Sequence, residues 1–289
     1  MTIAVSLKVN DGLVLAADSA STIMSSGGVE NVYDNALKVF NLRKGLPIGL
    51  VTWGLGGLAG LSISTLAKDL RVRLTGDSSD HMDWHLDDAS YTVLEVAERV
   101  KAFFYDEHYA PAAAAYAAEA EAEAVDDPYP ALGFIVAGYS ADGHHAEEFL
   151  LELSPDGCEG PTELRTADET GVSWAGQPEA ITRIVNGHGL ALGDVLVNDF
   201  ALEPDNVVAA VELIEDRLFS PLVNPAMPFQ DAIDLAEWLV SLSIAYSKFM
   251  PGAPTVGGPI ETAAISKHEG FKWVRRKHYF DNRLNPEVS

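Results

Sequence analysis

The chain has 289 residues, of which 47% are hydrophobic and 21% charged, as in an ordinary globular protein. Its 43 acidic and 19 basic side chains give a net charge of −24, which argues against binding to nucleic acid or to an anionic membrane. A single cysteine, Cys158, excludes an internal disulfide, and no apolar run reaches the roughly 20 residues of a membrane span. With no export signal visible at the N-terminus, these features predict a cytoplasmic protein.

The first predicted element is a β-hairpin at the start of the chain. Residues Thr2 to Val9 alternate between larger apolar side chains and small or polar ones, which is the period of a strand. Asn10-Asp11-Gly12 has the composition of a hairpin turn, in which Gly12 can adopt a positive φ. Leu13 to Ala17 is an almost continuous apolar run, typical of a buried strand.

Asp18 closes this apolar run, and an acid in such a place needs a partner. Lys38, which precedes the apolar Val39-Phe40, is the candidate cation. A three-residue turn would place Thr2, Ala4 and Asp18 on one face of the hairpin, whereas a two-residue turn would place Asp18 on the opposite face.

The later elements follow in blocks of strands and helices. Strands are expected at 38–42, 46–53, 132–139, 147–153, 260–266 and 271–275, and helices at 58–74, 90–124 with a kink at Pro111, 178–186, 204–218 and 230–249. This order predicts an α+β fold with two antiparallel sheets between helix layers, because a strict βαβ alternation is missing. With no repeat and no linker, residues 1–289 are expected to form one domain.

Three further patterns have simpler explanations than the functions they suggest. The run from Gly54 to Ala59 fits a dinucleotide-binding fingerprint, but the strands around it look antiparallel, so a tight strand-to-helix turn is favoured. His81 and His85 lie in a loop-like polar stretch, where solvent exposure is favoured over a metal site. We therefore expect neither a cofactor nor a metal.

A late basic cluster comprises Lys272, Arg275, Arg276 and Lys277. It could be a nucleic-acid patch. Pairing with acidic surface of the same or a neighbouring chain is favoured, because the chain is so acidic overall.

Thr2 is a candidate nucleophile. A threonine hydroxyl is a weak nucleophile without a base beside it, and a chain-terminal threonine supplies its own α-amine, whose pKa is about 8. Methionine aminopeptidases generally remove Met1 before a residue as small as threonine. Thr2 would then become the N-terminal residue.

The opening of the chain resembles a proteasome β-subunit, and also HslV-type peptidases and the bacterial ancestral-β-subunit group. In that family a mature N-terminal Thr is followed by an Asp-Gly turn, a strand ending Ala-Ala-Asp-Ser, and a Lys before two hydrophobic residues. This chain carries Thr2, then Asp11-Gly12 through Ala16-Ala17-Asp18-Ser19, then Lys38-Val39-Phe40. The resemblance is specific over about the first 60 residues. Farther on, Val256 to Ile260 resembles the Gly-Gly turn into a late family strand.

The resemblance implies a four-layer αββα N-terminal-nucleophile (Ntn) hydrolase sandwich and a threonine-type peptidase. Thr2 would be the nucleophile and its amine the proton shuttle, while Asp18 would hold Lys38, which lowers the pKa of the Thr2 groups. A backbone N–H near Gly54 would stabilise the oxyanion, and Trp53 would form a wall of the specificity pocket. Helical insertions near 77–130 and 188–230 exceed the compact family core.

The resemblance also implies a peptide or polypeptide substrate, a homo-oligomeric ring or helical array, and an ATP-dependent unfoldase as partner. The chain departs from the family where a Gly-Ser-Gly element and an Asp and a Ser support the threonine amine. In place of the Gly-Ser-Gly element this chain reads Ala175-Gly176-Gln177, and in place of the Asp and the Ser it reads Ala253 to Val256. Gln177 and Thr255 are the potential replacements for the missing residues. A non-catalytic structural subunit and a non-proteolytic Ntn amidase are the alternative functions.

Overall fold

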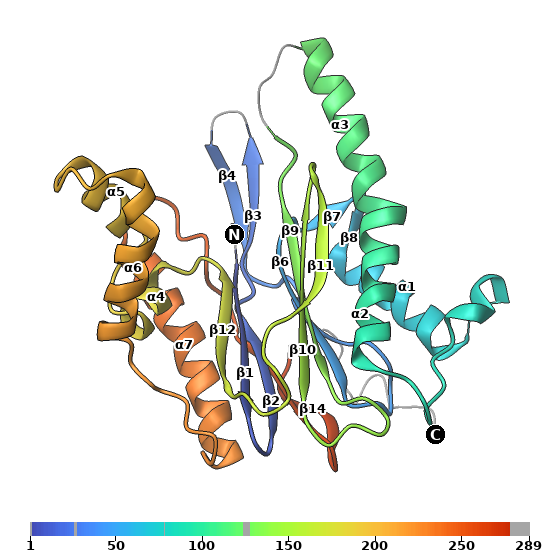
Figure 1. Ribbon diagram of the computed structural model, residues 1–289. Helices are drawn as coiled ribbons and strands as arrows, with labels where there is room; N and C mark the ends of the chain where they lie inside the picture. Colours follow the sequence, from blue (N-terminus) through green and yellow to red (C-terminus); the bar gives the residue numbers. More distant parts are fainter. Residues whose placement is uncertain (1, 26–27, 78, 124–127, 278–289) are drawn as a thin grey trace.

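The computed structural model describes residues 2–25, 28–77, 79–123 and 128–277, and it contains two five-stranded antiparallel sheets (Figure 1). The first sheet has the order β12-β1-β2-β13-β14, formed by Gly171–Gly176, Ile3–Val9, Gly12–Ala17, Glu261–Ser266 and Gly270–Arg275. The second has the order β11-β10-β9-β6-β5, formed by Gly157–Glu163, Glu147–Ser154, Leu132–Gly138, Ile48–Gly54 and Val39–Asn41. The mixture of helices and antiparallel sheets agrees with the predicted α+β class.

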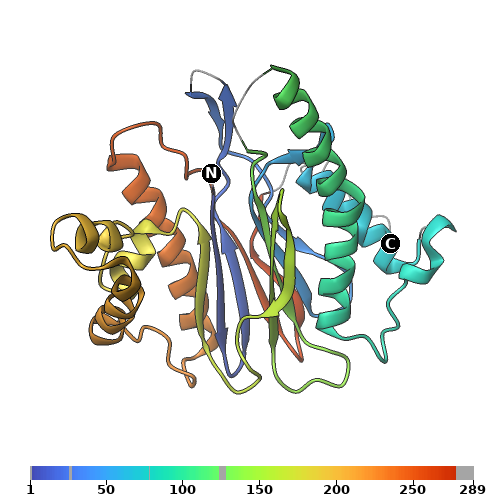
Figure 2. The same cartoon turned by 45° about the horizontal axis from the view of Figure 1, so that its top comes forward.

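Helices cover the outer face of each sheet (Figures 1 and 2). On the side of the first sheet lie α4 (Glu179–Val185), α5 (Leu192–Asn198), α6 (Pro204–Leu218) and α7 (Phe229–Phe249). On the side of the second lie α1 (Ile63–Thr75), a 3-10 segment (Ser79–Trp84), α2 (Val93–Lys101), a π-helical segment (Ala102–Tyr109) and α3 (Ala110–Glu123). Within the described ranges, no helix is both long and apolar enough to cross a membrane.

Three apolar clusters hold these elements together. One packs β1 and β2 against α7, and includes Ile3, Leu7 and Leu239. Another packs the second sheet against α1, α2 and the π-helical segment. The cluster between the sheets joins Ala4, Leu13, Leu15 and Ala17 of the first to Val39, Val51, Ile135 and Ala137 of the second. The two sheets therefore face each other, and any side chain on the inner face of β1 is enclosed by both.

The alternation predicted for β1 is confirmed, and both of its faces are buried. Its polar residues Ser6 and Lys8 enter the space between the sheets, where buried polar groups require partners. Ser6 Oγ donates to Glu148 Oε1 at 2.5 Å, and Lys8 Nζ donates to the Thr166 carbonyl at 2.9 Å. Glu148 Oε2 is paired with Arg165 Nη1 at 2.8 Å, so this carboxylate is held at both oxygens.

The turn of the first hairpin contains two residues, because Val9 lies opposite Gly12 and Ala4 opposite Ala17. The three-residue alternative is therefore wrong, and Gly12 does not use the positive φ that a glycine can adopt. Gly12 is required by close packing instead: a Cβ there would lie 2.5 Å from the Ile265 carbonyl oxygen and 2.8 Å from the Phe229 ring.

Two helices differ from their predicted bounds. Helix α1 begins at Ile63 rather than at residue 58, because the preceding residues form the small hairpin of β7 (Gly57–Leu58) and β8 (Leu61–Ser62). Ser62 caps the helix by accepting the Thr65 N–H at 3.1 Å. The long helical segment continues through Pro111, and an irregularity lies beside that proline, because the π-helical segment ends two residues before it.

Candidate active site

Asp18 lies just beyond the end of β2, and its carboxylate is the centre of the site. Oδ1 accepts the Lys38 ammonium at 2.7 Å and the Ile3 N–H at 3.0 Å, while Oδ2 accepts the N–H groups of Ala20 and Gly257, each at 3.0 Å. Because Asp18 is outside the regular strand, the strand's alternation does not fix its direction. The two-residue turn therefore still allows Asp18 to reach Lys38 and the residue that follows Thr2.

Lys38 stands immediately before β5 and is enclosed with its partner: its side chain is 7% exposed and that of Asp18 is 0% exposed. Burial lowers the pKa of Lys38 below its ordinary value, and the positive charge of Lys277 lowers it further, while Asp18 and Glu261 oppose the shift. An amine with a lowered pKa releases its proton more readily. The structure thus brings together the predicted Asp18 and Lys38 as a buried pair.

Thr2 is held at the end of β1 by the neighbouring edge strand β12. The Gln177 N–H donates to the Thr2 carbonyl at 2.7 Å, and Gly176 leaves room for this approach, since a Cβ there would lie 2.0 Å from the same oxygen. Gln177 and Thr255, the potential replacements for the family's supporting residues, line a separate cavity of about 380 Å³. The contact of Gln177 with Thr2 is made through its backbone.

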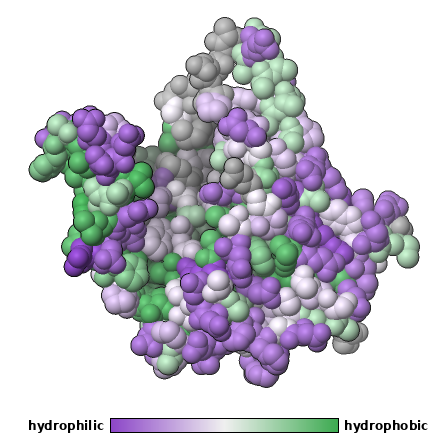
Figure 3. All heavy atoms as spheres, in the orientation of Figure 1, coloured by the Kyte–Doolittle hydropathy of each residue, from purple (hydrophilic) through white to green (hydrophobic). Residues whose placement is uncertain are grey.

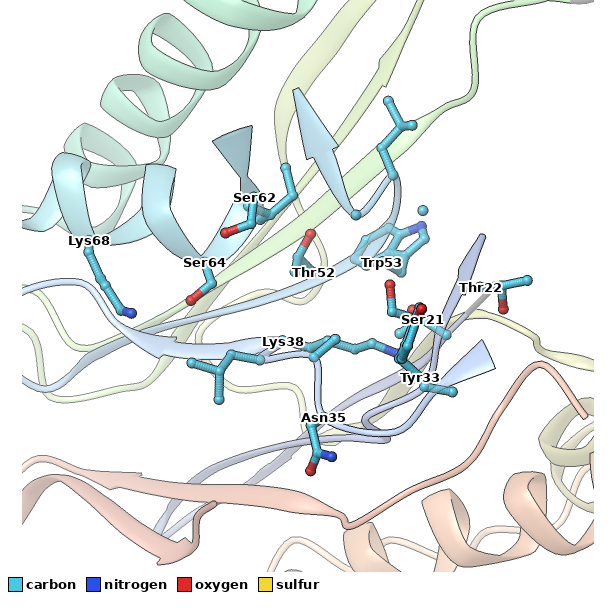
Figure 4. Close-up of a pocket in the computed structure, with 18 residues that line it drawn as sticks. Ser21, Thr22, Tyr33, Asn35, Lys38, Thr52, Trp53, Ser62, Ser64 and Lys68 are labelled. Carbon is cyan, nitrogen blue, oxygen red and sulfur yellow. The ribbon is translucent and has the colours of Figure 1, made fainter. Parts of the chain in front are cut away.

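A cavity of about 470 Å³, named here the Thr2 cavity, contains Thr2, Lys38 and Gly54 in its lining (Figure 4). Hydroxyl and amide groups supply much of its polar surface, namely Ser21, Thr22, Tyr33, Asn35, Thr52, Ser62 and Ser64. Figure 4 places Trp53 on the wall opposite Lys68, so the predicted pocket wall does lie in the cavity. Several of these groups come from β3 (Ser21–Ser25) and β4 (Gly28–Tyr33), a hairpin that sequence reasoning missed.

Gly54 ends β6 at the edge of this cavity. The Thr52 N–H donates to the Lys38 carbonyl at 3.0 Å, and the Leu55 N–H donates to the Ala131 carbonyl at 3.1 Å on the other side of the strand. Backbone N–H groups two residues apart point to the same edge of a strand. The Gly54 N–H therefore points toward the same edge of β6 as the Thr52 N–H, which is the edge that pairs with β5. At the level of Gly54, β5 has not yet begun, and the Thr2 cavity opens there.

Gly54 adopts a φ of +92°, and a Cβ there would lie 2.3 Å from the Ala131 carbonyl oxygen. Gly45 has nearly the same φ, +91°, with nothing within 4 Å of an added Cβ. We expect Gly54→Ala to lower the unfolding free energy by about 3 kcal/mol and Gly45→Ala by about 1 kcal/mol, because only the first adds overlap to backbone strain. Urea unfolding of both variants measures the difference, and equal losses would contradict this account of Gly54.

Two charged residues of the site were missed by sequence reasoning in this role. Glu261, at the start of β13, is 0% exposed, and its Oε2 accepts the Lys38 backbone N–H at 3.2 Å. Lys277 lies 3.7 Å from the same oxygen and donates to Ser19 Oγ at 2.5 Å and to the Ala36 carbonyl. The sequence did contain a signal for Glu261, because it is an acid at the start of an apolar strand. Asp18 was identified by the same kind of signal, an acid at the end of an apolar run.

The late basic cluster is divided by the structure. Arg275 pairs with Glu237 of α7 at 3.2 Å, and Lys277 pairs with Glu261, so these two contact acids of the same chain as expected. Lys272 and Arg276 instead line a second cavity, next to the Thr2 cavity.

His85, one of the two histidines weighed as metal ligands, lies away from this site. Its Nδ1 is 3.2 Å from the Thr75 carbonyl oxygen and 3.3 Å from Arg43 Nη1.

No family model and no curated protein matches this sequence. Among solved structures, the chain is similar to the Anbu (Gly-1) mutant from Hyphomicrobium sp. strain MC1, with 16% sequence identity and a TM-score of 0.43. The alignment covers 96% of this chain and 86% of that chain.

Proposed function

We propose that the protein is a threonine-type amide hydrolase of the Ntn class, acting on peptides or polypeptides through Thr2 after removal of Met1. The observation that carries this proposal is the shared carboxylate oxygen: Asp18 Oδ1 accepts both the Lys38 ammonium and the Ile3 N–H, directly after Thr2. Thr2 and Lys38 line one cavity, as a nucleophile and a neighbouring cation should. The two facing sheets with outer helices suit the predicted four-layer sandwich.

In the proposed reaction, the free α-amine of Thr2 takes the proton of its own hydroxyl as Oγ1 attacks the substrate carbonyl carbon. The positive charge of Lys38 lowers the pKa of that amine, which keeps it neutral at working pH. The Gly54 N–H stabilises the tetrahedral oxyanion, a contact worth about 3–4 kcal/mol. The amine then gives the proton to the leaving nitrogen, and water hydrolyses the Thr2 ester to regenerate the hydroxyl.

Intact mass spectrometry with a threonine-directed β-lactone tests this proposal. The expected masses show loss of Met1 and a gain equal to one whole reagent, because the lactone ring opens as its carbonyl carbon forms the ester with Thr2 Oγ1. Thr2→Ala should abolish the adduct, while Thr22→Ala, which removes another hydroxyl of the same cavity, should leave it in place. Retained Met1 with no adduct would overturn the hydrolase proposal in favour of a structural subunit. Turnover of small amides but not of peptides would point to an amidase.

We further propose that the chain assembles with copies of itself, as the resemblance implies. No residue of α5 or α6 is buried, and apolar side chains stand exposed on α6, namely Val208 and Leu213, and in the residues that follow the two helices, namely Phe200 and Phe219. Figure 3 shows green side chains among polar ones on this side of the molecule. If these helices form a subunit contact, Leu213→Asp with Phe219→Asp should reduce the mass measured by light scattering. An unchanged mass would remove these helices from the interface.

A further inference from the structure

The second cavity, named here the basic cavity, has a charge opposite to that of the chain. Its volume is about 530 Å³, and its basic lining residues are Lys44, Lys68, Arg71, Lys272 and Arg276. The chain as a whole carries 43 acidic against 19 basic side chains, yet Glu269 is the single carboxylate among the described residues that line this cavity. Such a concentration of cations on an acidic protein creates a local positive potential.

These cations come from three separate parts of the fold. Lys68 and Arg71 are three residues apart on α1 and therefore share one face of that helix. Lys272 and Arg276 come from β14 and the residue after it, and Lys44 comes from the turn between β5 and β6. Because three separate elements contribute cations to the basic cavity, it differs from a run of charges along one exposed segment.

Within residues 2–25, 28–77, 79–123 and 128–277, none of the five side chains has a carboxylate partner. Across the described residues, none of them takes part in an ion pair within 4.0 Å, although Arg275 and Lys277, their neighbours in sequence, both do. The guanidinium of Arg276 instead lies over the Trp273 ring, 4.9 Å from its centre. Burial and the nearby Arg276 charge lower the pKa of Arg71. Five cations gathered around a single carboxylate, with no ion pair among the described residues, favour an anionic ligand.

The basic cavity adjoins the Thr2 cavity. Leu37 and Lys68 line both, and Figure 4 shows Lys68 on α1 at the side of the Thr2 cavity away from Trp53. The Thr2 cavity itself has no carboxylate among its described lining residues. The two cavities therefore share part of their wall, and both volumes are in the range of ligand-binding pockets.

We propose that the basic cavity is the specificity subsite of this enzyme and selects peptide substrates that carry an acidic side chain near the cleaved bond. The inference rests on the proposed hydrolase function, because it places the substrate by reference to Thr2. Carboxylates of glutamate or aspartate would pair with Lys68 and Arg71 of α1 on one side and with Lys272 and Arg276 on the other. The aromatic rings of Phe271 and Trp273 would contact the apolar part of the same segment.

The test uses fluorogenic peptides in which one glutamine of a neutral parent is replaced by glutamate at each position in turn. We expect glutamate at one or two adjacent positions to raise kcat/KM about tenfold over glutamine, and high salt to reduce that ratio. Arg71→Gln with Arg276→Gln should bring the ratio close to one. Lys68→Gln with Lys272→Gln, both at exposed positions, provides a second pair if the first folds poorly. Lys248→Gln on α7 removes a positive charge on the other side of the molecule and should leave the ratio unchanged.

Binding of the same labelled peptides to the Thr2→Ala variant, followed by fluorescence anisotropy, separates this inference from the hydrolase proposal. A preference for glutamate that the two double variants remove, without any cleavage by the unmodified chain, would support the subsite and overturn the hydrolase. Cleavage with equal rates for glutamate and glutamine peptides would overturn the subsite and leave the hydrolase standing. Self-association lost in the double variants, with peptide preference unchanged, would also overturn it, because the cavity would then serve assembly.

Discussion

Replacing Lys38 with methionine should lower kcat/KM for a neutral peptide roughly a thousandfold while the chain still folds. The loss is expected because the cation beside Thr2 disappears, and with it the lowered pKa of the Thr2 amine. Folding should survive because the Asp18 carboxylate keeps three backbone N–H donors, each 3.0 Å from one of its oxygens. Peptide turnover and urea unfolding of the same preparation measure the two effects.

The pH profile distinguishes a role in the reaction from a structural one. The Thr2 amine must be neutral to accept a proton, so activity falls as the pH drops through its pKa. Removing the Lys38 charge raises that pKa, and the residual activity of Lys38→Met should therefore fall off at a higher pH than that of the unmodified chain. Lys248→Met, which removes an exposed cation from α7, should change neither rate nor profile. A Lys38→Met profile that is lower but not displaced would contradict the assigned role.

The local part of the site could be predicted from sequence, because its signals lie within short stretches of the chain. An acid at the end of a buried run and a lysine before another one identified Asp18 and Lys38, and the structure joins them at 2.7 Å. The turn length was undetermined, and the structure shows that it matters less than expected. Asp18 lies one residue past β2, where the strand no longer dictates the direction of a side chain.

The rest of the site depends on contacts between distant segments, which periodicity cannot reveal. Strand β12 supports Thr2 across more than 170 residues of sequence, yet Gly171–Gly176 is short, half-buried and flanked by glycine, so it gives little strand signal. Strand β4 of the β3–β4 hairpin is mostly exposed, and the hairpin was missed for the same reason. Glu261 appears in the sequence as an isolated charge and Lys277 as one member of the basic cluster, and only the fold places both beside Lys38.

Replacing Lys277 with methionine should cost about 3–5 kcal/mol of unfolding free energy at neutral pH, because Glu261 is then left as a buried carboxylate without its cation. Burial already raises the pKa of Glu261 above its ordinary value, and Lys277 is the leading influence that opposes the shift. Among the described residues Glu261 Oε1 has no hydrogen-bond partner, so the Lys38 N–H at Oε2 can compensate only in part. Adding Glu261→Gln should recover much of the loss, since the amide carries no charge.

The loss should also depend on pH, with a definite sign. In the Lys277→Met variant the folded chain holds a proton on Glu261 more tightly than the unfolded chain does, because only the folded state has the raised pKa. Stability is therefore retained at acid pH and decreases as the pH rises from about 4.3, the ordinary value, through the raised pKa. Chemical unfolding from about pH 4.5 to about pH 8 should show this decrease in Lys277→Met and lose it in the double variant. A constant difference from the unmodified chain over that range would mean that Lys277 does not change the pKa of Glu261 and acts by packing alone.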